Sequence, residues 1–378
     1  MDRSSWTVLI VGCFGLGLLV LLALMGGLFV YRFVSPLRAS SAPGPPATPQ
    51  AVGVVTGAGV LSKSAFAQDG RVGTVTEIAM GEFDPSPGTE IGVAGSRGAL
   101  FLDEQGNVKS AVTFSAPADH VDIIDADNDG ICEFMNRGGP GVPPSVIDHQ
   151  GTAVWTYAGP TANDMAAGDI DGDGKLEYAV GCSASVHLLE TDGTRVWQKP
   201  DDGVSHVELV DADADGSLEI VHSSAGGEMK LRDRDGNIMS RVPFAAASVA
   251  FSLCAWPGRG WPQHALVSAD ATIWIGALDG RIANALAAPQ CGKGGHARGI
   301  TARLKSGPSE YAAVVVGFPN QDRAIVYVYD PNGTLVYHEV LPEPCPSIAA
   351  VSLGDSETEV LLVGGEGKVY QYELASGE

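Results

Sequence analysis

One short turn recurs along most of this chain and limits how the rest of it can fold. A polar residue leads into each turn and a glycine closes it. The closing glycines are Gly106, Gly151, Gly193, Gly236, Gly280, Gly333 and Gly377, and they are 45, 42, 43, 44, 53 and 44 residues apart. Glycine suits this position because it readily adopts the positive φ that such hairpins require. A period in the low forties, with strand-like residues around each turn, is typical of a four-stranded β-propeller blade.

The two ends of this repeat predict how the ring closes. Gly377 is followed by a single residue, so the last unit lacks its fourth strand. Residues 59–66 have the pattern of that missing outer strand. We therefore predict an all-β, seven-bladed β-propeller, closed by an N-terminal strand and preceded by one transmembrane helix. The alternatives are a pair of β-sandwiches and a solenoid. With 49 glycines and 18% charged residues, the composition also favours short strands and turns over amphipathic helices.

The N-terminal part of the chain has the composition of a membrane anchor and a spacer. Residues 7–31 contain no charged side chain, and a helix of that length can cross a hydrocarbon core of roughly 30 Å. A cleaved signal peptide is the alternative, although its apolar region is normally shorter. The predicted organisation is a short cytoplasmic tail at 1–6, an anchor helix at 7–31, a Pro/Ala/Ser-rich linker at 32–56 and a propeller at 57–378.

Three consecutive units carry the same acidic nine-residue loop. Its positions 1, 3, 5 and 9 are carboxylates, and its position 6 is glycine. The carboxylates are Asp125, Asp127, Asp129 and Glu133; Asp169, Asp171, Asp173 and Glu177; and Asp211, Asp213, Asp215 and Glu219. Calcium takes six to eight hard oxygen ligands in a flexible geometry, whereas magnesium demands a stricter octahedron and keeps several waters. We therefore predict about three Ca²⁺ ions. The alternative is that the loops are solvated acidic turns.

Backbone oxygens are predicted to complete each shell, and the other units are predicted to bind weakly or not at all. The carbonyl groups at position 7 belong to Ile131, Lys175 and Ser217. The first unit has a degenerate copy at 82–90, in which two prolines and a serine leave weak or absent binding. The last three units lack the ligand pattern. Metal is therefore expected on one side of the ring.

These units resemble the FG-GAP or VCBS repeats of integrin α-subunit propellers and bacterial surface proteins. The resemblance covers residues 75–375, and residues 169–181 match the calcium-loop pattern of that family most closely. Residues 151–155 and 193–197 resemble, more weakly, the repeats of quinoprotein propellers. The first resemblance implies a propeller with calcium on one face, and it implies no particular ligand.

Calcium and charge together indicate the compartment and the class of partner. Basic residues flank the apolar segment on both sides, so the positive-inside rule does not decide its orientation. Loops of this kind suit the high calcium outside the cytoplasm. We therefore predict a single-pass membrane protein with its propeller at the cell surface or in the periplasm. A net charge of -22 argues against nucleic acid as a partner.

The predicted function is a protein-binding or glycan-binding adhesion or scaffold module. Loops that join the blades are expected to place five polar residues near the mouth of the central channel, where they would form a ligand-binding rim: His120, Asp164, His206, His296 and Arg298. An enzyme is the alternative, either a quinoprotein dehydrogenase or a polysaccharide lyase or hydrolase. No nucleophile-elbow or zinc-protease motif supports it, and no catalytic residue is assigned. Convergence of His120, His206 and His296 at metal-ligand distance would favour that alternative.

Overall fold

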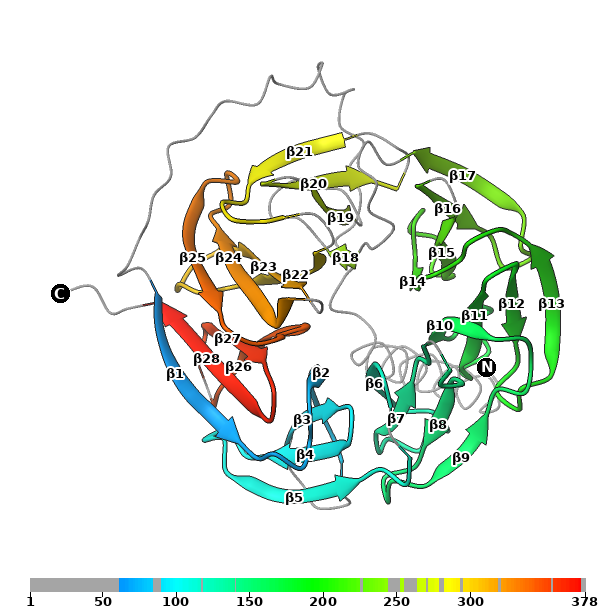
Figure 1. Ribbon diagram of the computed structural model, residues 1–378, viewed down its shortest axis with the longest axis horizontal. Coiled ribbons are helices and arrows are strands. Elements are labelled where there is room, and N and C mark those ends of the chain that lie inside the picture. Colours follow the sequence, from blue (N-terminus) through cyan, green and yellow to red (C-terminus); the bar gives the residue numbers. More distant parts are fainter. Residues whose placement is uncertain are drawn as a thin grey trace, which may run out of the picture. The chain divides into compact units, whose positions relative to one another are not determined.

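The structure is a computed structural model that describes residues 61–83, 90–116, 118–139, 141–224, 227–243, 252–254, 264–269, 271–278, 282–292, 295–318, 321–354 and 356–374. These residues form seven four-stranded antiparallel sheets, arranged as blades around a centre in Figure 1. Six sheets consist of four consecutive strands each. The seventh combines β1 from the N-terminal side with β26, β27 and β28 from the C-terminal side.

The strands follow one another regularly along the chain. Blades 1 to 3 consist of β2 (Val75–Gly81), β3 (Glu90–Gly95), β4 (Gly98–Leu102) and β5 (Val108–Thr113); β6 (Val121–Ile124), β7 (Glu133–Asn136), β8 (Ser145–Ile147) and β9 (Ala153–Thr156); and β10 (Ala162–Gly168), β11 (Glu177–Cys182), β12 (Ser185–Leu189) and β13 (Arg195–Pro200). Blades 4 to 6 consist of β14 (Val207–Val210), β15 (Glu219–Ser224), β16 (Glu228–Arg232) and β17 (Ile238–Pro243); β18 (Ser252–Cys254), β19 (His264–Ala269), β20 (Thr272–Ala277) and β21 (Ile282–Ala287); and β22 (His296–Ala302), β23 (Tyr311–Phe318), β24 (Arg323–Tyr329) and β25 (Leu335–Leu341). The closing blade consists of β1 (Leu61–Gln68), β26 (Ser347–Ser352), β27 (Glu359–Gly364) and β28 (Lys368–Leu374).

Burial changes systematically across each blade. Every residue of β3, β4, β11 and β12 is buried, because neighbouring blades cover both faces of these middle strands. The outermost strands β5 and β13 are mainly exposed. Apolar clusters fill the spaces between blades. Trp155 of blade 2 stacks on Tyr178 of blade 3 with ring centroids 5.0 Å apart, so an aromatic contact joins these two blades.

The recurring turns form the hairpins that lead to the outermost strands. Gly106, Gly151, Gly193, Gly236 and Gly333 all have φ between 78° and 86°. At Gly193, the amide donates to the Glu190 carbonyl over 2.8 Å, and the strand register shifts beside the turn, between Leu188 and Leu189. A β-carbon at Gly151 would lie 2.3 Å from the Thr113 carbonyl oxygen, so the position also excludes side chains by space. Gly280 and Gly377 lie outside the described residues.

The ring closes through strands from the two sides of the chain. β1 pairs antiparallel with β28, from Leu61 opposite Leu374 to Gln68 opposite Lys368, with a bulge between Ala65 and Ala67. The strand begins and ends two residues later than the predicted segment 59–66. This pairing leaves β1 as the outermost strand of its blade.

The predicted fold also included a transmembrane helix at residues 7–31. That segment lies outside the described residues, as do residues 1–6 and the linker at 32–56. In the part of the chain that is described, no helix has the length and apolarity needed to cross a membrane. The residues described between Leu61 and Leu374 form an all-β propeller, and the fold prediction is corrected to that extent.

Candidate metal centres and the central ion-pair network

The three acidic loops occupy the same place in blades 2, 3 and 4. Each connects the first strand of its blade to the second: β6 to β7, β10 to β11 and β14 to β15. The terminal glutamate of each loop is the first residue of the second strand and is buried. The aspartates lie in the exposed or half-buried part of the loop. Each loop is therefore held at one end by a rigid sheet.

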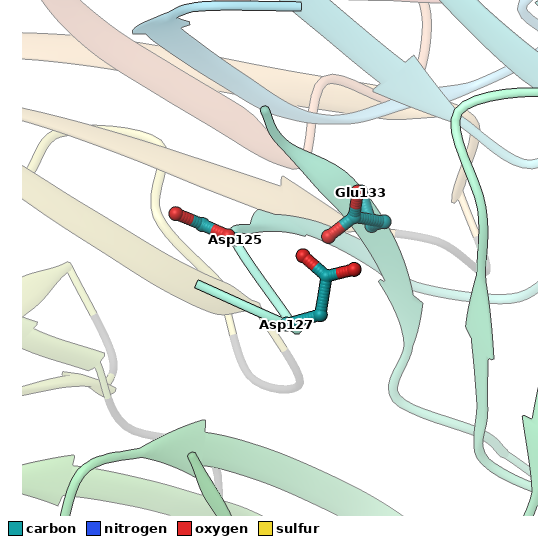
Figure 2. Close-up of side chains that lie close together, drawn as sticks. All are labelled: Asp125, Asp127 and Glu133. Carbon is teal, nitrogen blue, oxygen red and sulfur yellow. The ribbon is translucent and has the colours of Figure 1, made fainter. Parts of the chain in front are cut away.

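Three carboxylates converge in each loop. Asp125, Asp127 and Glu133 each offer an oxygen, and these oxygens all lie within 4.8 Å of one another. Figure 2 shows these side chains pointing toward one another. The other two loops bring together the equivalent positions, Asp169, Asp171 and Glu177, and Asp211, Asp213 and Glu219, within the same limit. Positions 1, 3 and 9 of each loop are thus placed where they could hold a metal ion.

The same backbone hydrogen bonds shape all three loops. The position-6 glycine amide donates to the position-1 aspartate: Gly130 to Asp125 over 3.0 Å, Gly174 to Asp169 over 3.0 Å, and Gly216 to Asp211 over 3.1 Å. The amide at position 2 donates to the glutamate at position 9 over 2.7 to 2.8 Å in each loop. These glycines have φ of 88° to 93°, which explains why the residue recurs there.

The position-5 aspartates take part in local backbone hydrogen bonds. Asp129, Asp173 and Asp215 are outside the converging groups. One oxygen of each accepts a hydrogen bond from the backbone amide two residues later, over 2.7 to 2.8 Å, as aspartates in turns commonly do. Their role as metal ligands stays a prediction. The position-7 carbonyls of Ile131, Lys175 and Ser217 stay predicted ligands.

The electrostatics of these loops favour a bound cation. Burial, and then the neighbouring aspartates, raise the pKa of Glu133 and of Glu219 to about 7, and raise the pKa of Glu177 as well. One oxygen of Asp211 is buried without a hydrogen-bond partner. These donors are hard oxygen atoms, the type that Ca²⁺ prefers. The residues therefore fit a divalent ion that would offset their mutual repulsion.

Blade 1 shows what happens where the acidic pattern is lost. Glu90 is the position-9 glutamate of the degenerate loop, and its side chain is 2% exposed. The Lys109 ammonium binds its carboxylate. In this blade a lysine supplies the positive charge. Within the described residues, Glu133, Glu177 and Glu219 have no lysine or arginine in an equivalent ion pair. One cation contacts a loop carboxylate in that part of the chain, with Lys175 lying 3.4 Å from Asp173.

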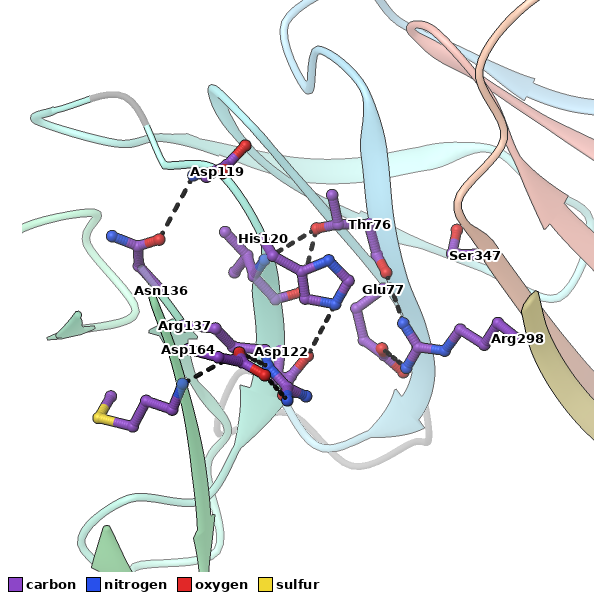
Figure 3. Close-up of polar contacts among 12 residues, drawn as sticks. Thr76, Glu77, Asp119, His120, Asp122, Asn136, Arg137, Asp164, Arg298 and Ser347 are labelled. Atoms are coloured by element: carbon purple, nitrogen blue, oxygen red, sulfur yellow. Dashed lines mark hydrogen bonds and ion pairs between the residues drawn. The ribbon is translucent and has the colours of Figure 1, made fainter. Parts of the chain in front are cut away.

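A second polar cluster links the innermost strands. Its centre is Arg137, which follows β7 and whose side chain is 6% exposed. The guanidinium binds both oxygens of Asp164 in blade 3, at 2.7 and 2.9 Å, and donates to the Val207 carbonyl of blade 4 over 2.5 Å. It also binds Asp122 of its own blade over 3.1 Å. One side chain therefore connects three blades, as part of the cluster in Figure 3.

His206 and Glu208 extend this cluster into blade 4. His206 Nδ1 lies 2.7 Å from Asp164, and its Nε2 lies 3.1 Å from Glu208. Burial opposes the charge on His206, but the carboxylates of Asp164 and Glu208 outweigh burial and raise the pKa of His206 to about 9. Burial raises the pKa of Glu208, but Arg137 and His206 outweigh that effect and lower it to about 2. At neutral pH the cluster therefore contains a protonated imidazole.

Arg298 forms a separate link between blades 6 and 1. Its guanidinium donates to the Thr76 carbonyl over 2.9 Å and pairs with the Glu77 carboxylate. Figure 3 shows Arg298 reaching toward the strand that carries both residues. His120 lies 3.5 Å from Asp122, and burial lowers the pKa of His120 to about 4 despite that carboxylate. His120 is therefore neutral at physiological pH.

Three of the five predicted rim residues, Asp164, His206 and Arg298, thus take part in ion pairs. The neutral His120 lies beside Asp122, and His296 begins β22, where burial and the charge of His206 lower its pKa. The prediction missed the residues Glu77, Asp122, Arg137 and Glu208. Alternating polar residues in the first strand of each blade could have indicated Glu77, Asp122 and Glu208. Arg137 lies beyond its strand and had no such pattern.

Stability should depend on pH through His206. Because its folded pKa is raised above the ordinary value near 6.5, its contribution is fully present below pH 6.5 and is lost as pH rises through 9. We expect His206→Gln to remove a pH-dependent part of the unfolding free energy, on the order of 3 kcal/mol, between these values. Urea unfolding at pH 6, 7.5 and 9.5 measures it. Equal pH dependence in the variant and the wild type would contradict the assignment.

Comparisons with known proteins support the fold alone. No protein-family model and no curated protein sequence matches this chain. Among solved structures, BBS1N in complex with ARL6DN is similar, with 14% identity over 82% of this chain and 95% of that chain, and a TM-score of 0.58. The WD40 domain of Neurospora crassa Pan2 has 12% identity over 84% of this chain and 96% of that chain, and a TM-score of 0.52. The chain thus has a β-propeller fold, and its resemblance to FG-GAP or VCBS repeats stays a prediction.

The histidines do not form the group that would have favoured an enzyme. Within the described residues, the only groups of three or more side chains placed to hold a metal ion are the three acidic loops. His120, His206 and His296 are not among them. The fold and the site together define a β-propeller with three adjacent acidic centres, each able to hold a metal ion.

Proposed function

We propose that this protein is a calcium-binding β-propeller that acts as a scaffold for a protein partner. The observation that carries the proposal is the convergence of three carboxylates at the same place in three adjoining blades, with the same backbone hydrogen bonds. Random acidic turns would not repeat both features. Calcium would stiffen the loops and leave the outer surface of the ring for binding.

The metal part of the proposal is tested by counting ions. We expect Asp171→Asn in the full-length chain to lower bound calcium from about three ions to about two, because it removes a carboxylate from the middle centre only. Equilibrium dialysis with metal analysis measures the number of calcium ions bound per protein chain. Asp192→Asn is the matched control, since Asp192 is an exposed aspartate of the same blade that caps a turn at Thr194. An unchanged count in Asp171→Asn would contradict the proposed centre.

The proposed protein partner is supported by the propeller fold and by one structurally similar protein. The similar structure of BBS1N was solved in complex with ARL6DN, so that propeller binds another protein. For this chain we propose a protein partner, with a glycan as the alternative ligand. A screen of immobilised proteins and glycans, run with calcium and again with a chelator, tests it. Calcium-dependent binding to one protein supports the proposal, and selective glycan binding favours the alternative.

The anchor and the location of the propeller complete the proposal. We propose that residues 7–31 span a membrane once, that residues 32–56 form a spacer, and that the propeller lies outside the cytoplasm. The support is the uncharged apolar segment and the low affinity expected of acidic loops of this kind. Protease treatment of intact cells tests the orientation. Digestion of the propeller supports it, and full protection contradicts it.

A further inference from the structure

A cavity of about 570 Å³ opens beside the outer strands of blades 3 and 4. None of its lining residues belongs to the acidic loops or to the central ion-pair network. Four cationic side chains line it, Lys199, Lys230, Arg232 and Arg241, together with three acidic residues. The chain has only 23 basic residues against 45 acidic ones. The lining of the cavity therefore carries more cations than acids, in contrast to the chain as a whole.

The inner part of the cavity is built around a buried carboxylate. Asp201 is 2% exposed in its side chain, and it accepts from Lys230 and from Arg232, each over 2.6 Å. Ser224 and the Asp202 amide also donate to it, over 2.9 and 3.0 Å. Its oxygens are therefore well satisfied. Two buried cations against one carboxylate leave this part of the cavity with a positive charge.

The neighbouring histidine does not change that balance. Arg232 Nε donates to His222 Nε2 over 2.9 Å, and His222 Nδ1 lies 2.9 Å from the Ser223 carbonyl. The imidazole must therefore be neutral, with its proton on Nδ1. Burial, in agreement with this geometry, lowers the pKa of His222 to about 4. His222 holds the guanidinium in place without adding charge.

Lys230 retains hydrogen-bonding capacity that points to a ligand. Its side chain is 9% exposed, and its ammonium makes one hydrogen bond in the described structure, to Asp201. An ammonium has three N–H donors, and leaving buried donors unsatisfied costs free energy. Closer to solvent, Arg241 lies 3.6 Å from Glu228, too far for a normal hydrogen bond, and Lys199 lies over the Trp197 ring. All three cations line the cavity, so an anion bound there would be attracted to each of them.

We propose that this cavity binds a small organic acid through a single carboxylate. The lining residues comprise four cations and three acids, Asp201, Asp202 and Glu228, so their net charge matches one negative charge better than two. The volume is many times the roughly 30 Å³ that one water molecule occupies in the liquid, so the cavity has room for the organic group that bears the carboxylate. Pro200 and Ile238 provide apolar contacts for that group. The inference is independent of calcium binding.

The test is a calorimetric titration of the full-length chain with D-glucuronate, with D-glucose as the uncharged counterpart. We expect saturable binding of D-glucuronate and none of D-glucose. The double variant Lys199→Gln, Arg241→Gln should lower the affinity for D-glucuronate at least about tenfold, because each removed cation contributes a charge-assisted hydrogen bond. Lys230→Met should abolish it. Lys305→Gln is the matched control, an exposed lysine elsewhere, and should bind as the wild type does.

Three outcomes would overturn the proposal. They are no saturable binding of D-glucuronate, equal binding of D-glucose, and unchanged affinity in the Lys199 and Arg241 double variant. The double variant matters because its two residues are half-buried or exposed, so the fold should tolerate both changes even if Lys230→Met unfolds. Thermal unfolding of each variant measures whether it remains folded.

Discussion

Removal of calcium should lower the unfolding midpoint of the full-length chain by about 10–20 °C. A ligand at a concentration 100 times its dissociation constant stabilises the native state by about 2.7 kcal/mol per site, so three sites give roughly 8 kcal/mol. One kcal/mol shifts the midpoint of a domain of this size by about 2 °C. The comparison is between 10 mM calcium and excess EGTA, and differential scanning calorimetry measures it.

Two controls separate specific binding from a general effect of salt. Magnesium at the same concentration should give a much smaller shift, since it holds its water and requires a stricter geometry. The triple exchange Asp127→Asn, Asp171→Asn and Asp213→Asn removes one converging carboxylate from each centre. Its midpoint should be nearly insensitive to calcium. A wild-type midpoint that does not change between calcium and EGTA would eliminate the metal centres.

Replacement of Arg137 by methionine should destabilise the propeller by about 3–5 kcal/mol. The exchange leaves the buried Asp164 with His206 as its remaining charged partner and removes the donor to the Val207 carbonyl. Breaking a buried ion pair costs this much because the partner charge stays buried without compensation. Urea unfolding monitored by circular dichroism measures the change in free energy.

The control for this experiment is an arginine in an exposed ion pair. Arg71 binds Asp69, and its side chain is 59% exposed. Arg71→Met should unfold close to the wild-type urea concentration, because solvent screens such pairs. If the two variants lost equal stability, Arg137 would have no special role in joining blades 2, 3 and 4.

The sequence predicted local features well and contacts between blades poorly. The closing glycines recur at intervals of 42 to 53 residues, and the acidic positions 1, 3 and 9 recur at the same places in each loop, so each obeys a local rule of backbone geometry. Asp129 shows the limit even within a loop, because its spacing alone did not show that its carboxylate accepts from the Ile131 amide. Arg137 shows the limit at long range. Its partner Asp164 is 27 residues away and Val207 is 70 residues away, and no periodic pattern relates them.

The cavity near Asp201 was not predicted for a similar reason. Lys230 and Arg232 lie at alternate positions of β16, which is ordinary for a strand with one polar face. Only the folded ring places Asp201, which follows β13 of the preceding blade, against both cations. Burial of the carboxylate and the cations together depends on how two blades pack, and composition along one strand carries no information on that packing.

The pairing of β1 with β28 has a consequence for how the chain is synthesised. Ser62 and Glu373 face each other across this pair although they are 311 residues apart. During translation β1 emerges early, and its partner is among the latest parts of the propeller to leave the ribosome. The nascent chain must therefore carry an unpaired strand for most of its synthesis, a state that exposes it to mispairing with other chains. The blade that closes the ring can accordingly form only when Leu374 becomes available.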